Sequence, residues 1–276
     1  MPSGTVLVTG ASSGIGHATV LLLRELGFDA VGAVRSPDDA ERLGAQGVRT
    51  ALLDVTDRDS IAAARDALDG RPLAGLVNNA GIAVAGPLEF LPLDELRHQL
   101  EVNLVGQVAV TQAFLPALRS ARGRIVNVSS IGGRVALPLV GPYNMSKFAL
   151  EAFSDSLRRE LHPHGVDVVV IEPGGVKTPI WQKGNEMADR IAADMPAEAK
   201  RLYGRMIEGL RRETVKIERE RGIEPRVVAE AIGHALSTRR PRARYLVGRD
   251  AKLRGPMAKL LPDRVMDRAI VRTLRG

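Results

Sequence analysis

The chain has 276 residues, of which 45% are hydrophobic, 26% charged and 3% aromatic, and it contains no cysteine. This composition excludes disulfides and thiolate metal sites and fits a globular protein with an aliphatic core; we expect no metal. The formal net charge is +7, but no nucleic-acid module is recognisable, so a solvated surface or an attraction for phosphate-bearing small molecules explains it better than nucleic acid.

The length of the apolar runs bears on location. No uncharged apolar run approaches the length of a membrane span. Residues 1–14 lack the basic and apolar regions of a signal peptide. We therefore expect a cytoplasmic protein.

Short apolar segments alternate with longer helical patterns along most of the chain. Strands are predicted at residues 5–10, 29–34, 48–55, 73–81, 123–130, 166–174 and 243–248. Helices are predicted at residues 16–27, 36–47, 57–70, 93–119, 147–162 and 225–238. Strands that are apolar throughout, with helices between them, predict a parallel sheet covered on both faces. We expect one Rossmann-type, doubly wound α/β domain over residues 1–276, with about seven strands.

Two segments depart from this alternation. Residues 185–224 are charged and mostly helical, and they follow the carboxyl end of the sixth strand. They form either an amphipathic surface helix pair or a lid over a hydrophobic ligand. The apolar stripe of this segment would consist of Met187, Ile191, Met195, Leu202, Met206, Ile207 and Leu210. Residues 251–276 form a basic, amphipathic extension that could lie on a membrane surface, although we favour packing against another subunit.

A glycine-rich loop joins the first strand to the first helix. The stretch VTGASSGIG contains Gly10, Gly14 and Gly16. Such glycines allow a tight turn and let the backbone approach a pyrophosphate, which then faces the helix N-terminus. A glycine triplet alone is a weak signal, but its place between strand and helix strengthens it. The alternative is a strand-to-helix turn that binds nothing.

The end of the second strand bears on the choice of cofactor. Residues 33–36 include no acidic side chain to receive the ribose hydroxyls of NAD. Val34 offers the ribose nothing polar, whereas Arg35 offers a fork of donors that suits a 2′-phosphate. NADP(H) is therefore preferred, with NAD(H) as the alternative. Arg35 could instead face solvent, since Asp38 and Asp39 are close enough in sequence to pair with it.

Tyr143 and Lys147 are four residues apart in the stretch PYNMSKFALEAF. A free tyrosine has a pKa near 10, too high for a base at neutral pH. An ammonium group on the same helical face would favour the phenolate and lower the pKa of Tyr143. The alternative is a surface pair whose apolar stems pack on the core.

Together these motifs resemble the short-chain dehydrogenase/reductase family, in its compact single-domain branch. The matching pieces are TGASSGIG (9–16), LDVTD (53–57), NNAG (78–81), Asn103, Ser130, YNMSK (143–147) and PGGVKT (173–178). Their order and spacing are similar to those of the family. The stretches IEPGGVKTPIW and ARYLVGRDAKLRG also resemble the hydroxysteroid and retinol dehydrogenase-like subgroup.

The resemblance implies catalytic roles for four residues. Tyr143 would be the general acid/base, and Lys147 would tune it and bind the nicotinamide ribose. Ser130 would stabilise the substrate oxyanion, with Ser129 as the neighbouring alternative. Asn103 would hold a water in a proton relay behind Lys147; alternatively, it is a helix-interior asparagine bonded to its own backbone.

The resemblance also implies a cofactor site. Its residues would be Gly10, Ser12, Ser13, Gly14, Ile15, Gly16, Arg35, Asp54, Val55, Asn79, Ala80, Gly81, Tyr143, Lys147, Pro173, Gly174, Val176 and Thr178. Asp54 could instead cap the helix that follows it. Ser12 and Ser13 leave the glycine loop without the basic residue that many NADP-dependent members have, so Arg35 would act nearly alone.

The implied activity is hydride transfer between NADP(H) and a carbonyl or secondary alcohol, on a steroid-like, retinoid-like or other apolar substrate. The family commonly forms dimers and tetramers, so a homo-oligomer is expected. One alternative is an NAD(H)-preferring alcohol dehydrogenase of the same family. Others are a nucleotide-sensing protein without catalysis, whose relatives typically lose the tyrosine or lysine, and a membrane- or nucleic-acid-associated module that uses the basic C-terminus.

Overall fold

The computed structural model describes residues 4–68 and 70–275, and its centre is a seven-stranded parallel sheet in the order β3-β2-β1-β4-β5-β6-β7. The strands are β1 (Thr5–Thr9), β2 (Asp29–Val34), β3 (Arg49–Leu52), β4 (Leu73–Asn78), β5 (Arg124–Val128), β6 (Asp167–Pro173) and β7 (Arg244–Val247). The chain starts at β1, moves outward to β3, and then crosses back to β4. This reversal opens a crevice at the carboxyl ends of β1 and β4, where α/β sheets bind ligands. The predicted doubly wound fold is confirmed.

Helices connect the strands. They are α1 (Gly14–Glu25), α2 (Pro37–Gly44), α3 (Arg58–Ala67), α4 (Leu93–Leu100), α5 (Gly106–Ala121), α6 (Gly141–Leu161), α7 (Ile180–Ala193), α8 (Ala197–Lys216), α9 (Pro225–Ser237), α10 (Arg249–Leu260) and α11 (Asp263–Arg275). Shorter turns are η1 (Leu88–Phe90), η2 (Glu101–Val105), η3 (Ile131–Gly133), η4 (His162–His164) and η5 (Ile217–Arg221).

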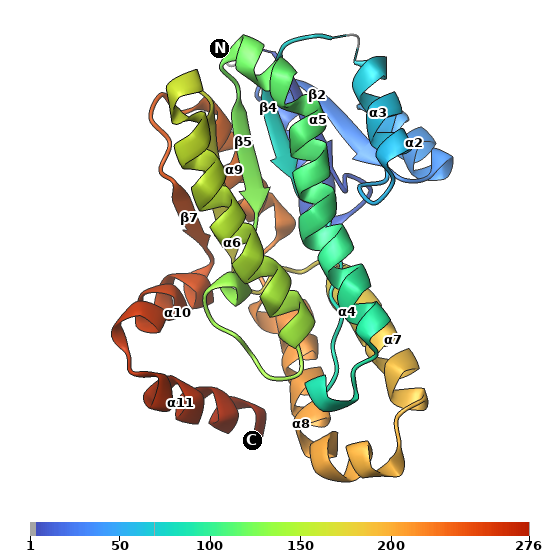
Figure 1. Ribbon diagram of the computed structural model, residues 1–276, viewed down its shortest axis with the longest axis vertical. Coiled ribbons are helices and arrows are strands. Elements are labelled where there is room, and N and C mark those ends of the chain that lie inside the picture. Colours follow the sequence, from blue (N-terminus) through green and yellow to red (C-terminus); the bar gives the residue numbers. More distant parts are fainter. Residues whose placement is uncertain (1–3, 69, 276) are drawn as a thin grey trace.

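Two hydrophobic cores cover the two faces of the sheet. In one, side chains from α1, α2 and α9 pack on the strands, and in the other, side chains from α3, α5 and α6 do so (Figure 1). Valine, leucine, isoleucine and alanine supply nearly all of this buried surface, with Phe28 and Phe114 as the aromatic exceptions. The near-continuous apolar strands are therefore explained by helices on both sides.

Two helix predictions were wrong in their bounds. The helix predicted at residues 93–119 is divided into α4 and α5 by the π-helical turn η2, a local bulge that hydrophobic periodicity does not reveal. The helix predicted from Lys147 begins at Gly141, with Pro142 in its first turn. Tyr143 and Lys147 therefore both lie within α6.

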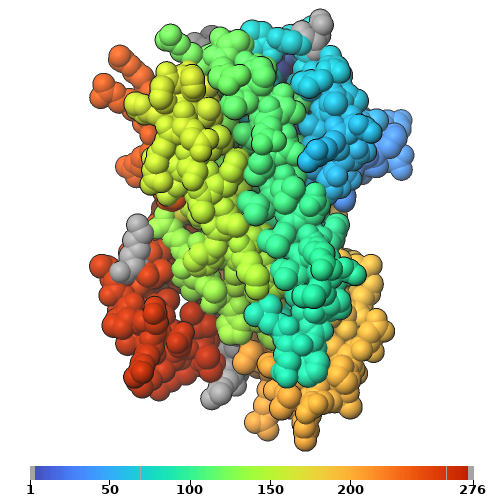
Figure 2. All heavy atoms as spheres, in the orientation of Figure 1, coloured from blue at the N-terminus to red at the C-terminus, as the bar shows by residue number. Residues whose placement is uncertain are grey.

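Helices α7, α8, α10 and α11 gather at the end of the molecule toward which the strands point, whereas α9 and β7 lie alongside the sheet (Figure 1). The helical segment begins with α7 at Ile180 rather than at residue 185. Ile191 is buried but Leu202 is exposed, so the predicted continuous apolar stripe is wrong at Leu202. Helix α11 contacts α8 of the same chain, and Figure 2 shows the C-terminal helices as a lobe beside the body. No helix in the described part of the chain is long and apolar enough to span a membrane.

Candidate active site

The loop between β1 and α1 forms an anion-binding cradle. Gly10 and Gly14 have φ angles of 66° and 56°, in the left-handed region that glycine adopts readily. Ser13 precedes α1 and makes no side-chain capping bond, so the first N–H groups of the helix remain available to an anion. A Cβ on Gly16 would overlap the carbonyl oxygen of Gly10, so the loop can lie this close to the helix only because residue 16 is glycine.

Thr9 and Asn79 lock this loop to the one that follows β4. The Thr9 hydroxyl accepts the backbone N–H groups of Asn79 and Ala80, both at 3.0 Å. The Asn79 side chain donates to the carbonyl oxygens of Thr9 at 2.9 Å and Gly10 at 3.2 Å. Asn78 is fully buried and bonds Thr111 and Asn127, so it braces the sheet. These hydrogen bonds hold the two loops together.

A cavity of about 570 Å³ opens at this end of the sheet. Its wall includes every predicted cofactor-binding and catalytic residue except Gly16 and Asn103. Lining residues that were not predicted include Ile82, Ala83, His98, Trp181, Lys183, Glu186, Met187 and Arg190. Most of these lie on α7. The one available signal was Trp181, the single tryptophan of the chain, three residues after the PGGVKT motif.

At one end of the cavity, Arg35 is exposed and forms no hydrogen bond or ion pair with another described residue. Asp39, a suggested partner, pairs with Arg42 instead. Asp54 lies nearby and accepts the N–H and the hydroxyl of Thr56 at 2.9 and 2.8 Å. Burial opposes ionisation of Asp54, but the Thr56 hydrogen bonds, together with the charges of Arg35 and His98, outweigh it and lower the pKa of Asp54.

Asp57, not Asp54, caps α3. The Asp57 carboxylate accepts the N–H groups of Asp59 at 2.9 Å and Ser60 at 3.3 Å. The suggestion that Asp54 caps this helix is therefore wrong. Its carboxylate is instead turned toward Thr56 at the cavity wall.

Tyr143 and Lys147 come from α6 and face the end of β5. Lys147 is 4% exposed, and its Nζ donates to the Val128 carbonyl oxygen at 2.8 Å. The same Nζ lies 5.7 Å from the centroid of the Tyr143 ring. Burial lowers the pKa of Lys147 to about 8, while the Glu151 carboxylate acts in the opposite direction.

Burial of the phenol has the largest effect on the pKa of Tyr143. Burial raises the pKa of Tyr143, and a hydrogen bond from Ser130 opposes the rise. This direction is opposite to the one predicted from Lys147 alone. The physical reason is that the phenolate loses its water on burial, while the lysine directs its ammonium to a backbone carbonyl.

Ser129 and Ser130 both line the cavity but have different environments. Ser130 is half-buried, and its hydroxyl accepts the Gly132 N–H at 3.0 Å. Ser129 is buried, and its hydroxyl has no hydrogen-bond partner in the described part of the chain. Ser130 affects the pKa of Tyr143 through a hydrogen bond, whereas Ser129 does not, and this favours Ser130 as the substrate contact.

Asn103 sits in the π-helical turn η2 behind the cavity wall. Its Oδ1 accepts the Ile82 N–H at 2.9 Å, and its Nδ2 donates to the Ile82 carbonyl at 3.0 Å and the Ser146 hydroxyl at 3.2 Å. The suggestion that it bonds its own backbone is therefore wrong. Asn103 ties the loop after β4 to α6, on which Ser146 in turn bonds the Tyr143 carbonyl.

A family model described as short chain dehydrogenase matches residues 4–189, more than half of the chain. The chain belongs to the short-chain dehydrogenase family. It is 41% identical to human "Short-chain dehydrogenase/reductase family 9C member 7" over 98% of this chain and 89% of that protein. It is 37% identical to mouse "Retinol dehydrogenase 5" over 95% and 86%.

A solved short-chain dehydrogenase from Burkholderia cenocepacia, in complex with NADP, superimposes with a TM-score of 0.74 at 26% identity, covering 96% of each chain. The present short-chain dehydrogenase is thus an oxidoreductase that acts on CH–OH groups with a nicotinamide dinucleotide. The glycine cradle and the free helix N-terminus fit the pyrophosphate of such a cofactor. Among the described residues there is no cluster of His, Cys, Asp or Glu suited to a metal.

Proposed function

We propose that this short-chain dehydrogenase transfers hydride between NADP(H) and a carbonyl or secondary alcohol carbon of a hydrophobic small molecule. The observation that carries the proposal is the convergence of Ser130, Tyr143 and Lys147 on one wall of the cavity that also contains the glycine cradle. These three residues supply an oxyanion donor, a proton donor and a cation.

In the reducing direction, the Ser130 hydroxyl donates to the substrate carbonyl oxygen, and Tyr143 gives that oxygen its proton. The raised pKa keeps Tyr143 protonated at neutral pH, which suits this role as an acid. Lys147 holds a positive charge beside the phenolate that remains. The bound nicotinamide supplies the hydride. In the oxidising direction the same groups accept the alcohol proton.

The preference for NADP(H) rests on Arg35. Arg35 lines the cavity and forms no hydrogen bond or ion pair with another described residue, although its charge acts on the nearby Asp54 carboxylate. A charge-assisted hydrogen bond to a 2′-phosphate contributes about 1.5–3 kcal/mol, or roughly tenfold to a hundredfold in affinity. An NAD(H)-preferring alcohol dehydrogenase remains the alternative, because no second basic residue lies in the glycine loop.

The substrate class rests on the helical segment after β6. We propose that residues 185–224, with the start of α7, form a lid over an apolar ligand. Trp181, Met187 and Ile82 all line the cavity, and the Trp181 Nε1 donates to the Val176 carbonyl at 2.7 Å. A steroid-like or retinoid-like ring system suits such a wall, and the name of mouse retinol dehydrogenase 5 agrees with that class.

The first experiment is a cofactor titration followed by the fluorescence of Trp181, the single tryptophan. NADPH should bind at least about tenfold tighter than NADH. Arg35→Ala should remove this preference, while Arg65→Ala, which lies on the exposed face of α3, should keep it. Equal or tighter binding of NADH would refute the preference for NADP(H). Binding of neither nucleotide would contradict the dehydrogenase function.

A homo-oligomer is also proposed. Val105, at the end of η2, and Met145 and Phe148, on α6, are exposed apolar side chains. Water-exposed apolar surface of this kind marks contact sites. Light scattering should give a dimer or tetramer, and Phe148→Asp should shift it toward the monomer.

A further inference from the structure

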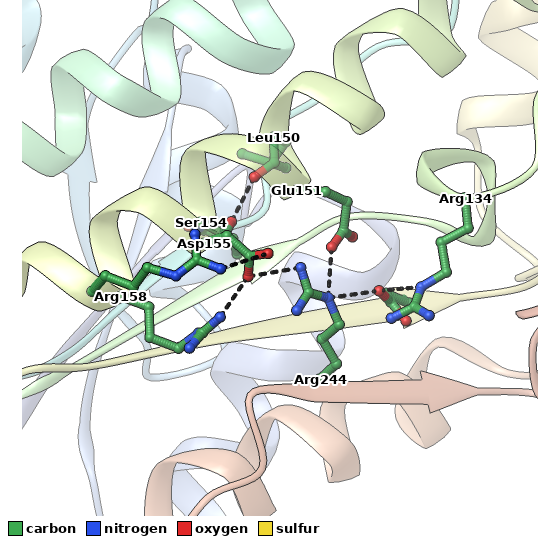
Figure 3. Close-up of polar contacts among 10 residues, drawn as sticks. Arg134, Leu150, Glu151, Ser154, Asp155, Arg158 and Arg244 are labelled. Atoms are coloured by element: carbon green, nitrogen blue, oxygen red, sulfur yellow. Dashed lines mark hydrogen bonds and ion pairs between the residues drawn. The ribbon is translucent and has the colours of Figure 1, made fainter. Parts of the chain in front are cut away.

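A buried group of charged side chains lies behind the catalytic lysine. Glu172, on β6, is 0% exposed, and Glu151, one helical turn after Lys147 on α6, is 9% exposed. Figure 3 shows Glu151 reaching from α6 toward Arg244, while Arg134, from the loop after β5, binds the Glu172 carboxyl. No part of the proposed hydride transfer uses these carboxyl groups.

Two arginines bind the two carboxyls. Arg134 Nε donates to Glu172 Oε1 at 2.7 Å. Arg244 Nε donates to Glu151 Oε2 at 3.0 Å and lies 3.4 Å from Glu172 Oε1. A second nitrogen of Arg244 is 2.8 Å from Asp155, so part of its charge is directed outward. Arg244 is therefore shared among three acids.

The remaining oxygens of the two carboxyls lack partners. Glu151 Oε1, Glu172 Oε2 and the Ser129 hydroxyl are all buried without a hydrogen bond within the described residues. Burial, followed by the charge of Glu151, raises the pKa of Glu172 to about 7, against the opposing effect of Arg134. Two adjacent buried carboxyls favour a single shared proton, because one carboxylic O–H can then donate to its neighbour.

This carboxyl pair is packed directly against the catalytic helix. A Cβ placed on Gly133 would lie 2.9 Å from the Ser129 hydroxyl, 3.1 Å from the Lys147 carbonyl and 3.2 Å from Glu151 Cγ. The negative charge of Glu151 also opposes the fall in the pKa of Lys147. Gly133 thus packs against the Ser129 hydroxyl, the Lys147 backbone carbonyl and the Glu151 side chain, and a larger residue there would displace them.

Few other charges face the pair. Asp155 on α6 pairs with Arg158 and Arg244 at the outer edge. Asp250 on α10 accepts the Gly175 N–H at 2.8 Å. On α9, the ring of His234 meets the ring of Tyr245 edge to face, with the ring centroids 5.8 Å apart. Asp155 reaches the group only through Arg244, so Arg134 and Arg244 are the cations that face the two carboxyls. Of the two carboxyls, Glu151 is the one whose charge acts on Lys147.

We propose that Glu151 and Glu172 share one proton and together act as positioning residues that balance the charge of Lys147. With the proton held, the pair contributes one negative charge beside the buried ammonium. When the proton is lost to solvent, a second negative charge develops and holds Lys147 protonated to higher pH. The inference rests on the proposed role of Lys147, and it predicts that the pair and the lysine titrate as a coupled system.

The first test is infrared spectroscopy of the protein alone. The carbonyl stretch of a protonated carboxylic acid should be present below pH ~6 and disappear above pH ~8. Glu172→Gln should abolish this band, and Glu213→Gln, which removes a partly buried, ion-paired carboxylate on α8, should leave it unchanged. If Glu172→Gln does not fold, Glu151→Gln is the second variant. It also leaves a single carboxyl, and Glu151 is the more exposed of the two residues. Absence of the band in the unaltered protein would overturn the proposal.

The second test follows Lys147 by NMR of the 15N-labelled lysine ammonium groups, with Lys147→Met for assignment. Glu151→Gln should lower the pKa of Lys147 by about one unit, and Glu172→Gln by less. Glu151→Asp should restore most of the shift. An unchanged lysine titration in Glu151→Gln would refute charge balancing even if the shared proton is present.

These two readouts require no cofactor or substrate, so they separate the pair from the enzymatic proposal. If turnover is found, the alkaline limb of the kcat/KM profile should move down with the pKa of Lys147. If no turnover is found while the infrared and NMR results are as expected, the proposed substrate is wrong and the proposal of the shared proton remains.

Discussion

The ammonium of Lys147 donates to the backbone carbonyl of Val128 at 2.8 Å, which fastens the catalytic helix to the last residue of β5. Tyr143 lies on the same helix, with its ring centroid 5.7 Å from the lysine nitrogen. The position of the lysine is therefore set by the strand and not by the tyrosine. This hydrogen bond holds the ammonium near the tyrosine, as the proposed role of Lys147 requires.

Tyr143→Phe should abolish the proton transfer while leaving cofactor binding nearly unchanged. Loss of a positioned general acid lowers kcat by about 10²–10⁴-fold, whereas the phenyl ring still fills the buried site. NADPH affinity, measured through Trp181 fluorescence, should be retained. Tyr245→Phe, which alters a tyrosine on β7 away from the cavity, is the control. Full turnover in Tyr143→Phe would remove that residue from the mechanism.

Lys147→Met should increase stability at neutral pH even though it abolishes activity. The pKa of Lys147 is about 8 in the folded protein against 10.5 in the unfolded chain, so folding disfavours the charged form. Removing that penalty should add about 1–3 kcal/mol to the free energy of unfolding, after allowing for the lost bond to Val128.

The difference in free energy of unfolding between Lys147→Met and the unaltered protein should decrease as the pH rises from 8 to 10.5. Between pH 8 and 10.5 the unfolded chain binds more protons at Lys147 than the folded protein does, so the free energy of unfolding of the unaltered protein rises with pH. Lys147→Met lacks this rise, and its advantage should shrink through that window. Urea unfolding at several pH values checks this, and a constant difference would contradict a buried, desolvated lysine.

Asn103→Ala should destabilise the protein as well as impair activity. The side chain makes three hydrogen bonds that join the loop after β4 to α6. Its loss leaves one backbone group, the Ile82 N–H, without its partner, whereas the Ile82 carbonyl still accepts a hydrogen bond from Gln99 at 3.0 Å. Such a group costs about 1–3 kcal/mol. Thermal unfolding should therefore shift downward together with kcat. Loss of kcat at unchanged stability would point instead to a role in the proton relay alone.

Asp250→Ala should weaken cofactor binding although the residue does not line the cavity. Its carboxylate accepts the Gly175 N–H at 2.8 Å and occupies the space where a Cβ on Gly174 would lie. It thus holds the loop after β6 against the cavity. We expect the NADPH Kd to rise several-fold, since about 1 kcal/mol is a factor of five. Asp250→Asn should keep part of the contact, and Asp263→Ala on α11 is a surface control.

Much of the site could be predicted because its residues lie at the ends of strands. In a parallel sheet the carboxyl ends meet at one edge, so Gly10, Asn79, Ser130 and Pro173 had to come together once the strand order was known. Residues on α7 and α10 could not be predicted in this way. Their positions depend on how helices outside the alternating pattern dock on the finished sheet.

The sequence by itself determined the parallel α/β sheet, the glycine loop and the pairing of Tyr143 with Lys147, because alternation, strand-to-helix turns and helical spacing are local properties. Only the tertiary structure decided that burial raises the pKa of Tyr143, and that Glu151 and Glu172 meet behind Lys147. Desolvation and charge pairing depend on which distant segments exclude water from a side chain. That exclusion exists only after β6, β7 and α6 have packed together.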